Sequence, residues 1–375
     1  MDPVKPVSLT RRAVLALPLA VAACSRRSEP FAGYAFIANQ ESGALAVVDL
    51  SVMQVAKHIP IEGSPTEVHA CHTRPAVYAL TPANGRVHEV QTGNLRVERK
   101  LTVGSAATRM LLSPDEARLY VLVREPRSLV IVNLDDFKIE WRVTLPEEPV
   151  GLSLPSDGSV IAVTSGASLH LVDLKSRRLG PVLGRGVYGE VRFLKNSRTL
   201  VAANIEERLL SAYRAEDRVE DSRLITHLPL AVRPDNLCFN RDGGQLFITG
   251  EGMDAVVVVY PYDTPEVAKT VLAGRAPGVM AASGSLLFVA SPASGDVSIL
   301  NIETTRVIAV AQVGSDPGFI AITPDDAYAL ILNRQSGDVA VLQVAAIQPN
   351  RFKSASLLTV IPVGSRPVSA ALRAV

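Results

Sequence analysis

A stretch near the C-terminus decides the fold, and it reads LFVASPASGDVSILN from Leu287 to Asn301. The same pattern returns as ALILNRQSGDVAVL over Ala329–Leu342, and it is present near the N-terminus as YAFIANQESGALAVVDL over Tyr34–Leu50. The equivalent aromatic residues Phe36 and Tyr78 lie 42 residues apart. A fixed period of this length is typical of chains built from repeated units, such as β-propellers and solenoids.

Each repeat consists of short segments that look like strands. Runs of four to eight β-branched, aliphatic or aromatic residues are bounded by Gly, Pro, Ser, Asn or Asp, which is the signature of strands and turns. In the third repeat these segments are Leu119–Leu122, Leu129–Val132, Trp141–Leu145 and Val150–Leu154. Outside the N-terminal segment we find no apolar i, i+3, i+4 spacing, which a helical solenoid needs. Four strands per repeat therefore predict an all-β propeller of four-stranded blades.

The fourth segment of each repeat is interpreted as the innermost strand of a blade, and it follows a recurrent turn. Eight such turns occur, beginning with Gly63-Ser64-Pro65 and ending with Ser365-Arg366-Pro367. The first three segments, Tyr34–Ile61, have no inner strand before them, and the last inner strand, Val368–Leu372, has no outer strands after it. Joining the two ends completes a blade and closes the ring. We predict eight blades over residues 34–375, with seven as the alternative if a degenerate fourth or fifth repeat is not a blade.

Residues 1–24 have the features of a bacterial lipoprotein signal. Lys5, Arg11 and Arg12 precede an apolar stretch, Ala13–Ala23, that is too short to span a bilayer. The stretch ends in Val-Ala-Ala before Cys24, as in a lipobox, so Cys24 is the predicted site of lipidation. An ordinary cleaved signal peptide is the alternative, and general secretory and twin-arginine export both stay open. We expect a tether over residues 25–33 and an exported protein, lipid-anchored in the periplasm or outer cell envelope.

The charge balance argues against one class of partner. Lys and Arg number 38, Asp and Glu number 37, and the net charge is +1. Proteins that hold nucleic acid by charge show a clear basic excess, so we expect no nucleic-acid partner. Cys71 and Cys238 fall on the first and fifth predicted inner strands, on opposite sides of an eightfold ring, which is too far for a disulfide. We expect a monomer whose membrane contact is the lipid anchor.

The best-preserved repeats resemble YVTN-type propeller repeats. Those repeats run strand, Ser-Gly turn, strand, Val-Gly, and a Pro-started strand ending in Ser-Pro-Asp-Gly, and Phe288–Leu300 and Val313–Asp326 follow this order. Leu112–Asp115 and Ser156–Gly158 match the ending. The resemblance covers nearly all of residues 33–375, strongly in repeats one, seven and eight and weakly in repeats four to six. It implies a propeller of the lactonase-like superfamily, and it says little about function, because a fold is a weak guide to activity.

Propeller ligands usually meet the mouth of the central channel, where the turns into the innermost strands converge. The position two residues after the turn varies in a way that the repeat itself does not require, and in repeats one to eight it holds Glu67, Arg109, Gly151, Glu190, Asn236, Val279, Phe319 and Ser369. The predicted ligand-binding residues at the mouth are Glu67, Arg109, Glu148, Glu190, Arg233, Asn236, Asp316 and Arg366. We expect them to bind a small polar or anionic molecule or a peptide. Solvated turn residues that pair among themselves are the alternative.

Searches for cofactor chemistry find no complete motif. Cys71-His72 has Val68 where covalent haem attachment needs a second Cys, and Trp141 is the single tryptophan, whereas quinone-dependent propeller dehydrogenases carry many. His69 and Cys71 face one side of a predicted strand and are weak candidates for metal ligands, but a third ligand is not apparent. We therefore predict no cofactor and no metal site.

Two classes of function stay open. The lack of catalytic motifs favours a non-catalytic ligand- or protein-binding propeller of the bacterial cell envelope. The alternative is a lactonase- or cyclase-like enzyme, or a tetrapyrrole-modifying enzyme, with acid–base residues at the channel mouth. Acid–base catalysis needs groups with tuned pKa values that converge on one point, and Glu67, Glu190 and His69 are the candidates. A carboxylate hydrogen-bonded to a histidine would favour the enzyme, and charges scattered around an open rim would favour binding.

Overall fold

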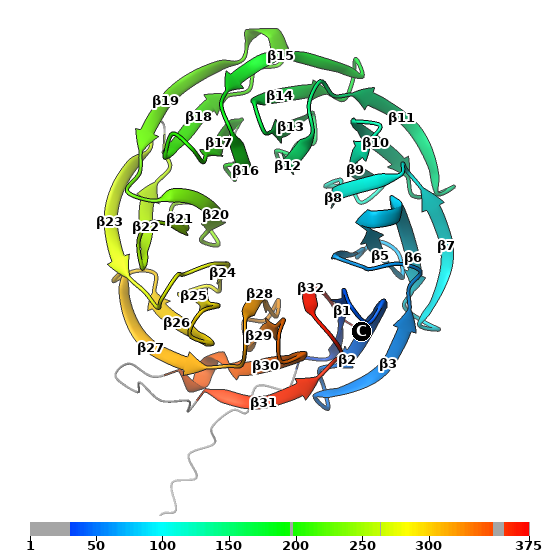
Figure 1. Ribbon diagram of the computed structural model, residues 1–375, viewed down its shortest axis with the longest axis vertical. Helices are drawn as coiled ribbons and strands as arrows, with labels where there is room; N and C mark the ends of the chain where they lie inside the picture. The colour runs from blue at the N-terminus through cyan, green and yellow to red at the C-terminus, as the bar shows by residue number, and fades with distance from the viewer. Residues whose placement is uncertain (1–30, 196–197, 263, 348–355, 375) are drawn as a thin grey trace, which may run out of the picture.

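The computed structural model describes residues 31–195, 198–262, 264–347 and 356–374. In this part of the chain, eight four-stranded antiparallel sheets stand around a central axis and form an eight-bladed β-propeller (Figure 1). The described residues contain no α-helix, and none of their helical segments has the length and apolar character that crossing a bilayer requires. The predicted fold and the predicted eight blades are confirmed. The predicted signal segment, including Cys24, lies outside the described residues.

Every blade has the same strand order from the axis to the rim (Figure 1). The innermost strands are β4 (Glu67–Ala70), β8 (Ala106–Leu112), β12 (Pro149–Ser153), β16 (Tyr188–Phe193), β20 (Arg233–Phe239), β24 (Met280–Ala282), β28 (Pro317–Ile322) and β32 (Pro367–Ala374). The second strands are β1 (Gly33–Asn39), β5 (Ala76–Thr81), β9 (Arg118–Glu125), β13 (Val160–Ser165), β17 (Thr199–Asn204), β21 (Leu246–Glu251), β25 (Leu286–Ser291) and β29 (Tyr328–Asn333).

The outer half of each blade repeats equally. The third strands are β2 (Ala44–Asp49), β6 (Arg86–Gln91), β10 (Ser128–Asn133), β14 (Ser168–Asp173), β18 (Leu209–Arg214), β22 (Ala255–Tyr260), β26 (Asp296–Asn301) and β30 (Asp338–Gln343). The outermost strands are β3 (Gln54–Pro60), β7 (Arg96–Thr102), β11 (Lys138–Thr144), β15 (Arg178–Arg185), β19 (Arg223–Pro229), β23 (Glu266–Leu272), β27 (Arg306–Gln312) and β31 (Leu357–Pro362). Short 3-10 helices lie in the connections: η1 (Pro82–Asn84), η2 (Val219–Asp221) and η3 (Val344–Ala346).

The two ends of the chain share one blade, as the sequence predicted. Strand β32 pairs antiparallel with β1, so that the blade has the order β3-β2-β1-β32. At the end of β1, the side-chain amide of Asn39 donates a hydrogen bond to the carbonyl oxygen of Val363 at 2.6 Å. The backbone N–H of Gln40 donates to the carbonyl oxygen of Arg366 at 2.9 Å. These bonds close the ring without a covalent link, and β1 is paired on both sides, with β2 and with β32.

The core lies between neighbouring blades. Tyr78 and Leu80 of β5 pack with Val121 of β9 in the next blade, while the alternate residues of β5, Val77 and Ala79, pack against the blade on the other side. Both faces of the second and third strands are therefore covered, and a strand that is covered on both faces reads as a nearly continuous apolar run. This explains why the second and third strands of each blade show little alternation of apolar and polar residues in the sequence.

The chain leaves each blade by crossing over its own hairpin. In all eight blades, the residue after the outermost strand donates a backbone hydrogen bond of 2.8–3.1 Å to the residue before the third strand, as Val103 does to Gly85. Gly85 has a φ of +55°, and a Cβ there would overlap the carbonyl oxygen of Gly104 on the crossing chain. Because only glycine has no Cβ, it suits both the left-handed backbone and the close crossing.

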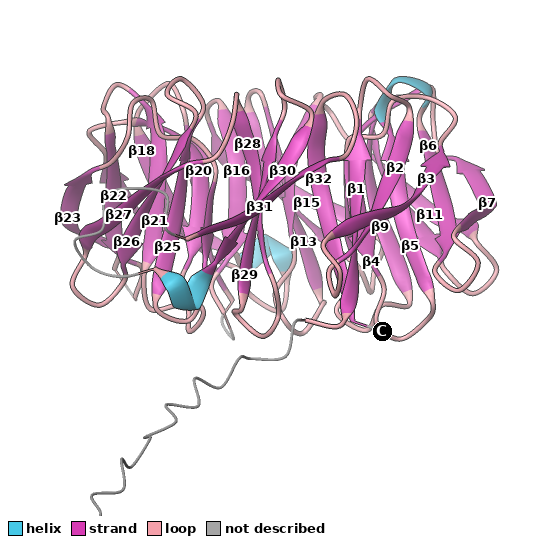
Figure 2. Ribbon diagram, turned by 90° about the horizontal axis from the view of Figure 1, so that it is seen from below, coloured by secondary structure: helices cyan, strands magenta, loops and turns pink. Residues whose placement is uncertain are grey.

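The ring has two distinct faces (Figure 2). Strand β1 begins and β32 ends at the lower edge in Figure 2, since Gly33 pairs with Ala374; we call this side the N-terminal face. The connections from innermost to second strands also lie there. The turns that lead into the innermost strands lie at the opposite edge, which we call the mouth face. A site is therefore assigned to a face by the connection that carries it.

Candidate functional site

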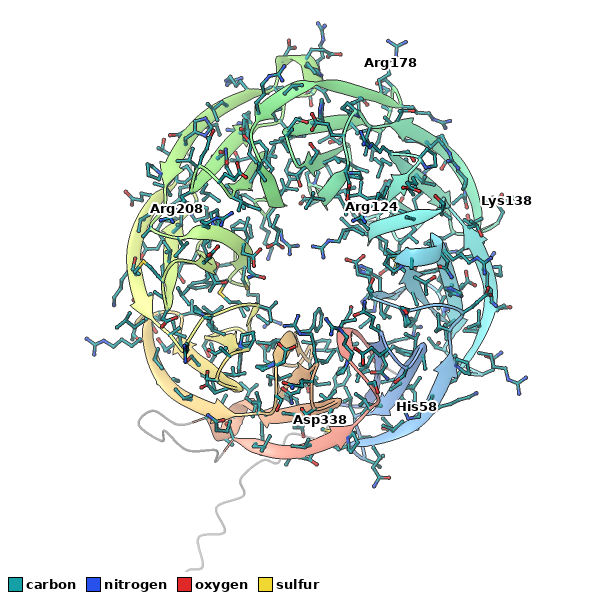
Figure 3. All side chains as sticks on the ribbon, viewed as in Figure 1. His58, Arg124, Lys138, Arg178, Arg208 and Asp338 are labelled. Carbon is teal, nitrogen blue, oxygen red and sulfur yellow. The ribbon has the colours of Figure 1, made fainter. Side chains whose placement is uncertain are left out.

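The central channel holds two connected cavities. The larger has a volume of about 590 Å³ and the smaller about 390 Å³. Arg109, Arg192 and Phe319 line both, so the two form one continuous space along the axis. Figure 3 shows side chains from around the ring extending toward this opening, with Arg124 among them. Pockets of several hundred Å³ with a few convergent polar groups are typical of small-molecule sites.

One position of the repeat supplies a residue from every blade to this channel. Strand pairing places Glu67 opposite Leu80, Arg109 opposite Leu122 and Phe319 opposite Leu332, which is the same register in three different blades. All eight residues that the sequence assigned to this position line one or both cavities: Glu67, Arg109, Gly151, Glu190, Asn236, Val279, Phe319 and Ser369. The turn therefore fixes the register, and the register fixes which side chains meet on the axis.

The eight predicted ligand-binding residues divide into two groups. Five line the cavities: Glu67, Arg109, Glu148, Glu190 and Asn236.

The other three do not line the cavities. Each pairs with a residue at or just after the end of a second strand. Arg233 makes an ion pair with Glu251 at 2.9 Å, and Asp316 makes one with Arg334 at 2.6 Å. Arg366 donates to the side-chain oxygen of Gln40 at 3.0 Å. These three residues fit the alternative of solvated turn residues that pair with their neighbours.

Two channel carboxylates hold neighbouring blades together. Oε2 of Glu67 on β4 accepts a hydrogen bond from the backbone N–H of Met110 on β8 at 2.6 Å. Oε2 of Glu190 on β16 accepts one from the N–H of Leu237 on β20, also at 2.6 Å. An innermost strand is the edge of its sheet, so some of its backbone N–H groups have no partner within the blade. The carboxylates of Glu67 and Glu190 accept hydrogen bonds from such N–H groups of the next blade.

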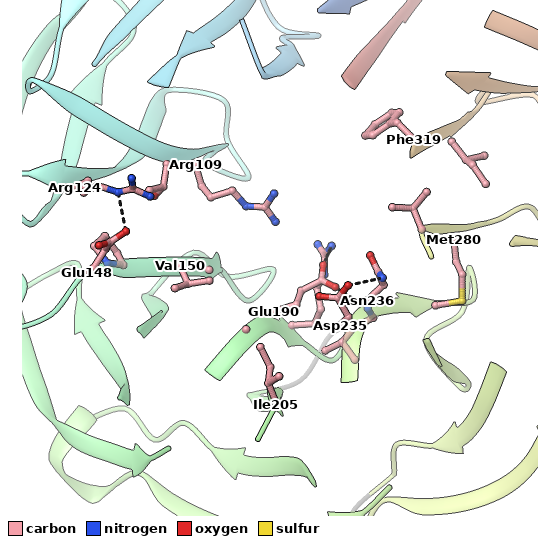
Figure 4. A pocket seen from close by; sticks show the side chains of 18 residues that line it. Arg109, Arg124, Glu148, Val150, Glu190, Ile205, Asp235, Asn236, Met280 and Phe319 are labelled. Atoms are coloured by element: carbon pink, nitrogen blue, oxygen red, sulfur yellow. Dashed lines mark hydrogen bonds and ion pairs between the residues drawn. The ribbon is translucent and has the colours of Figure 1, made fainter. Parts of the chain in front are cut away.

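The cations of the channel differ in how firmly they are held (Figure 4). Arg124 pairs with Glu148 at 2.7 Å, and Arg192 hydrogen-bonds Glu190 on its own strand. Arg109 makes one ion contact, to Glu67 at 3.4 Å, and no hydrogen bond of its side chain occurs within the described residues. Figure 4 shows Arg109 reaching from its strand into the channel. Its side chain is 47% exposed.

The channel has a charged wall and an apolar wall. The charged side chains come from the five consecutive blades whose innermost strands are β4, β8, β12, β16 and β20. They are Glu67, Arg109, Arg124, Glu148, Glu190, Arg192 and Asp235. Opposite them, β24 and β28 contribute Met280 and Phe319, with Val279 just before β24. Figure 4 shows Phe319 and Met280 facing Arg109 and Glu190 across the opening. A molecule in the channel thus meets charge on one side and hydrocarbon on the other.

The smaller cavity contains two groups with altered pKa values. Burial raises the pKa of Glu67, although Arg109 and the Met110 N–H act in the opposite direction. Burial, with a smaller contribution from Arg109, lowers the pKa of His69 to about 4, and a hydrogen bond to the Met110 backbone opposes the shift. Burial disfavours the charged form of both groups, which is the physical cause of both shifts. Glu67 and His69 share no hydrogen bond within the described residues.

The two weak candidates for metal ligands, His69 and Cys71, lie in different surroundings: His69 lines the smaller cavity and Cys71 does not. Cys71 is fully buried, and its Sγ donates to Oε2 of Glu116 at 3.2 Å. Over the described ranges, no three His, Cys, Asp or Glu side chains are grouped in a way that could hold a metal ion. Cys71 and Cys238 are both free thiols, and burial raises the pKa of Cys238 to about 12. The Cys238 thiol therefore lacks the lowered pKa that reactive cysteines require.

Three charged residues of the channel were missed by the sequence reasoning. Arg192 lies two residues after Glu190, so strand alternation already places both on the same side and would have revealed it. Asp235 directly precedes the predicted Asn236. Arg124 lies near the end of β9, a second strand, and nothing in the repeat marks that position as facing the channel.

Comparison with known proteins supports the fold. No family model and no curated protein matches the chain. The solved structure of dihydro-heme d1 dehydrogenase NirN in complex with DHE is similar, with a TM-score of 0.72 and 13% identity over 90% of this chain and 75% of that one. Apo AztD from Citrobacter koseri has a TM-score of 0.69 and 14% identity, over 92% of this chain and 98% of that one. Hydrazine synthase of Kuenenia stuttgartiensis gives 0.55 and 17%, over 75% and 96%.

These likenesses concern the fold alone. Propellers with so little sequence in common host unrelated functions, so shared architecture does not carry a shared ligand. The resemblance to YVTN-type repeats and the lipoprotein signal stay predictions.

Proposed function

We propose that this protein is a non-catalytic, ligand-binding β-propeller of the bacterial cell envelope, exported and lipid-anchored through Cys24. Its ligand is a small amphipathic molecule with a carboxylate or similar anionic group, held in the central channel. The proposal includes a monomer with no bound cofactor and no nucleic-acid partner. The observation that carries it is the guanidinium of Arg109, which extends into the channel with one 3.4 Å ion contact.

A guanidinium offers five N–H donors in a planar fork that matches a carboxylate or phosphate. Arg192 and Arg124 each have a close carboxylate partner, whereas Arg109 has capacity left for a ligand. Phe319 lies across the opening and offers an apolar surface to the rest of the molecule. This combination of one directed cation and an apolar wall favours an amphipathic anion over a wholly polar one.

The carboxylates favour binding over catalysis. Glu67 and Glu190 each accept a 2.6 Å hydrogen bond from a neighbouring blade, so each has a structural role that proton transfer would interrupt. A catalytic base is expected to point its free oxygens at a substrate.

Mass spectrometry of the full-length protein, extracted from the membrane of the producing bacterium, tests both halves of the proposal. Under denaturing conditions we expect a lipid adduct on an N-terminal Cys24. Under native conditions we expect an additional small mass that disappears on denaturation. Arg109→Gln should lose this mass, and Arg366→Gln should keep it, because Arg366 pairs with Gln40 outside the cavities.

The two halves can fail separately. An unmodified chain in the soluble fraction would overturn the lipid anchor and leave the channel proposal standing. A wild-type protein without any bound mass, or an Arg109→Gln variant that retains it in full, would overturn channel binding and direct the search to protein partners.

A second candidate is an enzyme of the lactonase, cyclase or tetrapyrrole-modifying class. It is favoured by the pKa shifts that burial causes in one cavity, upward for Glu67 and downward for His69, since such pairs of shifted pKa values mark acid–base sites. One structural neighbour is named as a dihydro-heme d1 dehydrogenase. If catalysis occurs, the molecule bound to Glu67→Gln should differ in mass from that bound to the wild type, because substrate accumulates. Identical bound masses would exclude this candidate.

A further inference from the structure

A second pocket lies on the N-terminal face of the ring, away from the channel mouth. It has a volume of about 390 Å³ and is formed by the connections β20–β21, β24–β25 and β26–β27 together with the end of β22. All these connections lie at the edge of the ring where β1 begins (Figure 2). The pocket shares no lining residue with either cavity of the channel. We call it the tyrosine pocket.

Two stacked aromatic rings form one side of this pocket. The rings of Tyr260 and Tyr262 lie 6.2 Å apart between centroids, with an interplanar angle of 29°. Tyr262 is 64% exposed, which is unusual for so large a side chain with an apolar face. A Cβ at Gly244 would lie 3.2 Å from the hydroxyl oxygen of Tyr262, so the lack of a side chain there leaves room for this ring.

The polar side of the pocket presents oriented donors. The side-chain oxygen of Asn240 accepts the backbone N–H of Gln245 at 2.9 Å, and that of Asn301 accepts the N–H of Thr304 at 2.7 Å. These bonds fix each amide so that its NH₂ group is the part left for a ligand.

The same side also presents acceptors. One oxygen of Asp242 accepts the N–H of Gly244 at 2.8 Å, which leaves the second oxygen available. Within the described residues the carboxylate of Glu303 has no hydrogen bond or ion pair. No Lys, Arg or His side chain lines the pocket.

This composition selects one class of ligand. An anion is disfavoured, because the two carboxylates have no cation beside them. A simple amine satisfies the carboxylates but leaves the oriented amide NH₂ groups without acceptors. Hydroxyl groups both donate and accept, so a neutral sugar matches donors and acceptors together, and the C–H face of its ring packs on an exposed aromatic ring. We propose that the tyrosine pocket binds a neutral carbohydrate of one or two rings.

The connections that form the pocket are braced by contacts across four blades. Arg241, in the β20–β21 connection, makes a 2.7 Å ion pair with Asp326 in the β28–β29 connection. The same carboxylate accepts the N–H of Gly284 at 3.2 Å, and Lys195 donates to the carbonyl oxygen of Arg241 at 3.0 Å. A site that is rigid before the ligand arrives loses less entropy on binding.

Titration of the purified full chain with maltose, cellobiose and N,N′-diacetylchitobiose, followed by calorimetry and by tyrosine fluorescence, tests this site. We expect saturable binding of at least one disaccharide. Tyr262→Ala should weaken it at least tenfold, and Tyr262→Phe should retain most of it because the ring persists. Leu272→Ala is the matched control, since Leu272 is 75% exposed on β23 of the same blade and lies outside the pocket.

Three outcomes would overturn the proposal. The first is the absence of saturable binding with all three sugars, and the second is equal affinity in the wild type and Tyr262→Ala. The third is saturable binding of tetramethylammonium chloride in place of the sugars, which would assign the pocket to organic cations. Because Tyr262 is exposed, its variants are expected to fold, and equal thermal unfolding of all variants verifies this.

Discussion

Well-preserved and weakly preserved repeats contribute different residues to the channel. Repeats seven and eight, which follow the repeat pattern closely, supply Phe319 and Ser369 to the channel. Repeats four and five, which follow it weakly, supply Glu190, Arg192 and Asp235. All eight blades nevertheless keep the same backbone hydrogen bond between the hairpin and the crossing chain. The backbone hydrogen bonds that all blades share therefore maintain the fold, and the side chains at the axis are free to vary.

Disrupting the contact between a hairpin and the chain that crosses it, which all eight blades have, should reduce stability the most. Gly85→Val places a β-branched side chain at a φ of +55° and against the carbonyl of Gly104. Left-handed strain and overpacking of about 2 kcal/mol each predict a loss of about 4 kcal/mol in the free energy of unfolding. Urea unfolding measures it. Gly93→Val is the control, because a Cβ at Gly93 meets no atom within 4 Å; equal losses in both variants would show that the crossing does not matter.

Acid should act next, through a histidine behind the charged wall. His88 is fully buried, and burial lowers its pKa to about 4, so the unfolded chain binds a proton near pH 6.5 before the folded chain does. Stability that is present above pH 6.5 is therefore lost as the pH falls toward 4, by on the order of 3 kcal/mol. His88→Gln should flatten this dependence in urea unfolding between pH 7 and pH 4.5. The exposed His58, changed to Gln, should leave it as in the wild type.

The smallest effect compares two hydrogen bonds between neighbouring blades, one accepted by a carboxylate and one by a hydroxyl. Glu190→Ala leaves the N–H of Leu237 without its 2.6 Å partner and should cost about 2 kcal/mol. Ser369 accepts the N–H of Val68 at 3.3 Å, a longer bond, and Ser369→Ala should cost about 0.5 kcal/mol. Thermal unfolding of the two variants gives the order. A larger loss for Ser369→Ala would contradict the view that the charged wall holds its blades by its carboxylates.

Much of the fold could be predicted because it depends on local signals. The repeat period, the turn residues and the alternation along strands are all readable within 42 residues, and they gave the closing blade and the register of Glu67 and Arg109 correctly. The pairing of Asp316 with Arg334 was not readable, since the partner lies on a hairpin loop 18 residues away and repeats there vary. Arg124 was missed because a second strand is ordinarily covered by its neighbours.

The tyrosine pocket was beyond sequence reasoning for a related cause. Its residues come from four separate segments of two blades. Only the arrangement in space brings Tyr262 close to Gly244 and into one pocket with Asn301.

The position of the chain ends sets how solutes reach the channel. Strand β1 begins at the N-terminal face, while Arg124 and Glu148 of the larger cavity lie toward the mouth face. Phe31 lies seven positions after Cys24 in the sequence, so an extended tether reaches at most about 25 Å. If Cys24 carries lipid as proposed, the ring sits with its mouth turned from the bilayer toward the surrounding solution. Solutes then enter the channel from the surrounding solution, without passing the headgroups first.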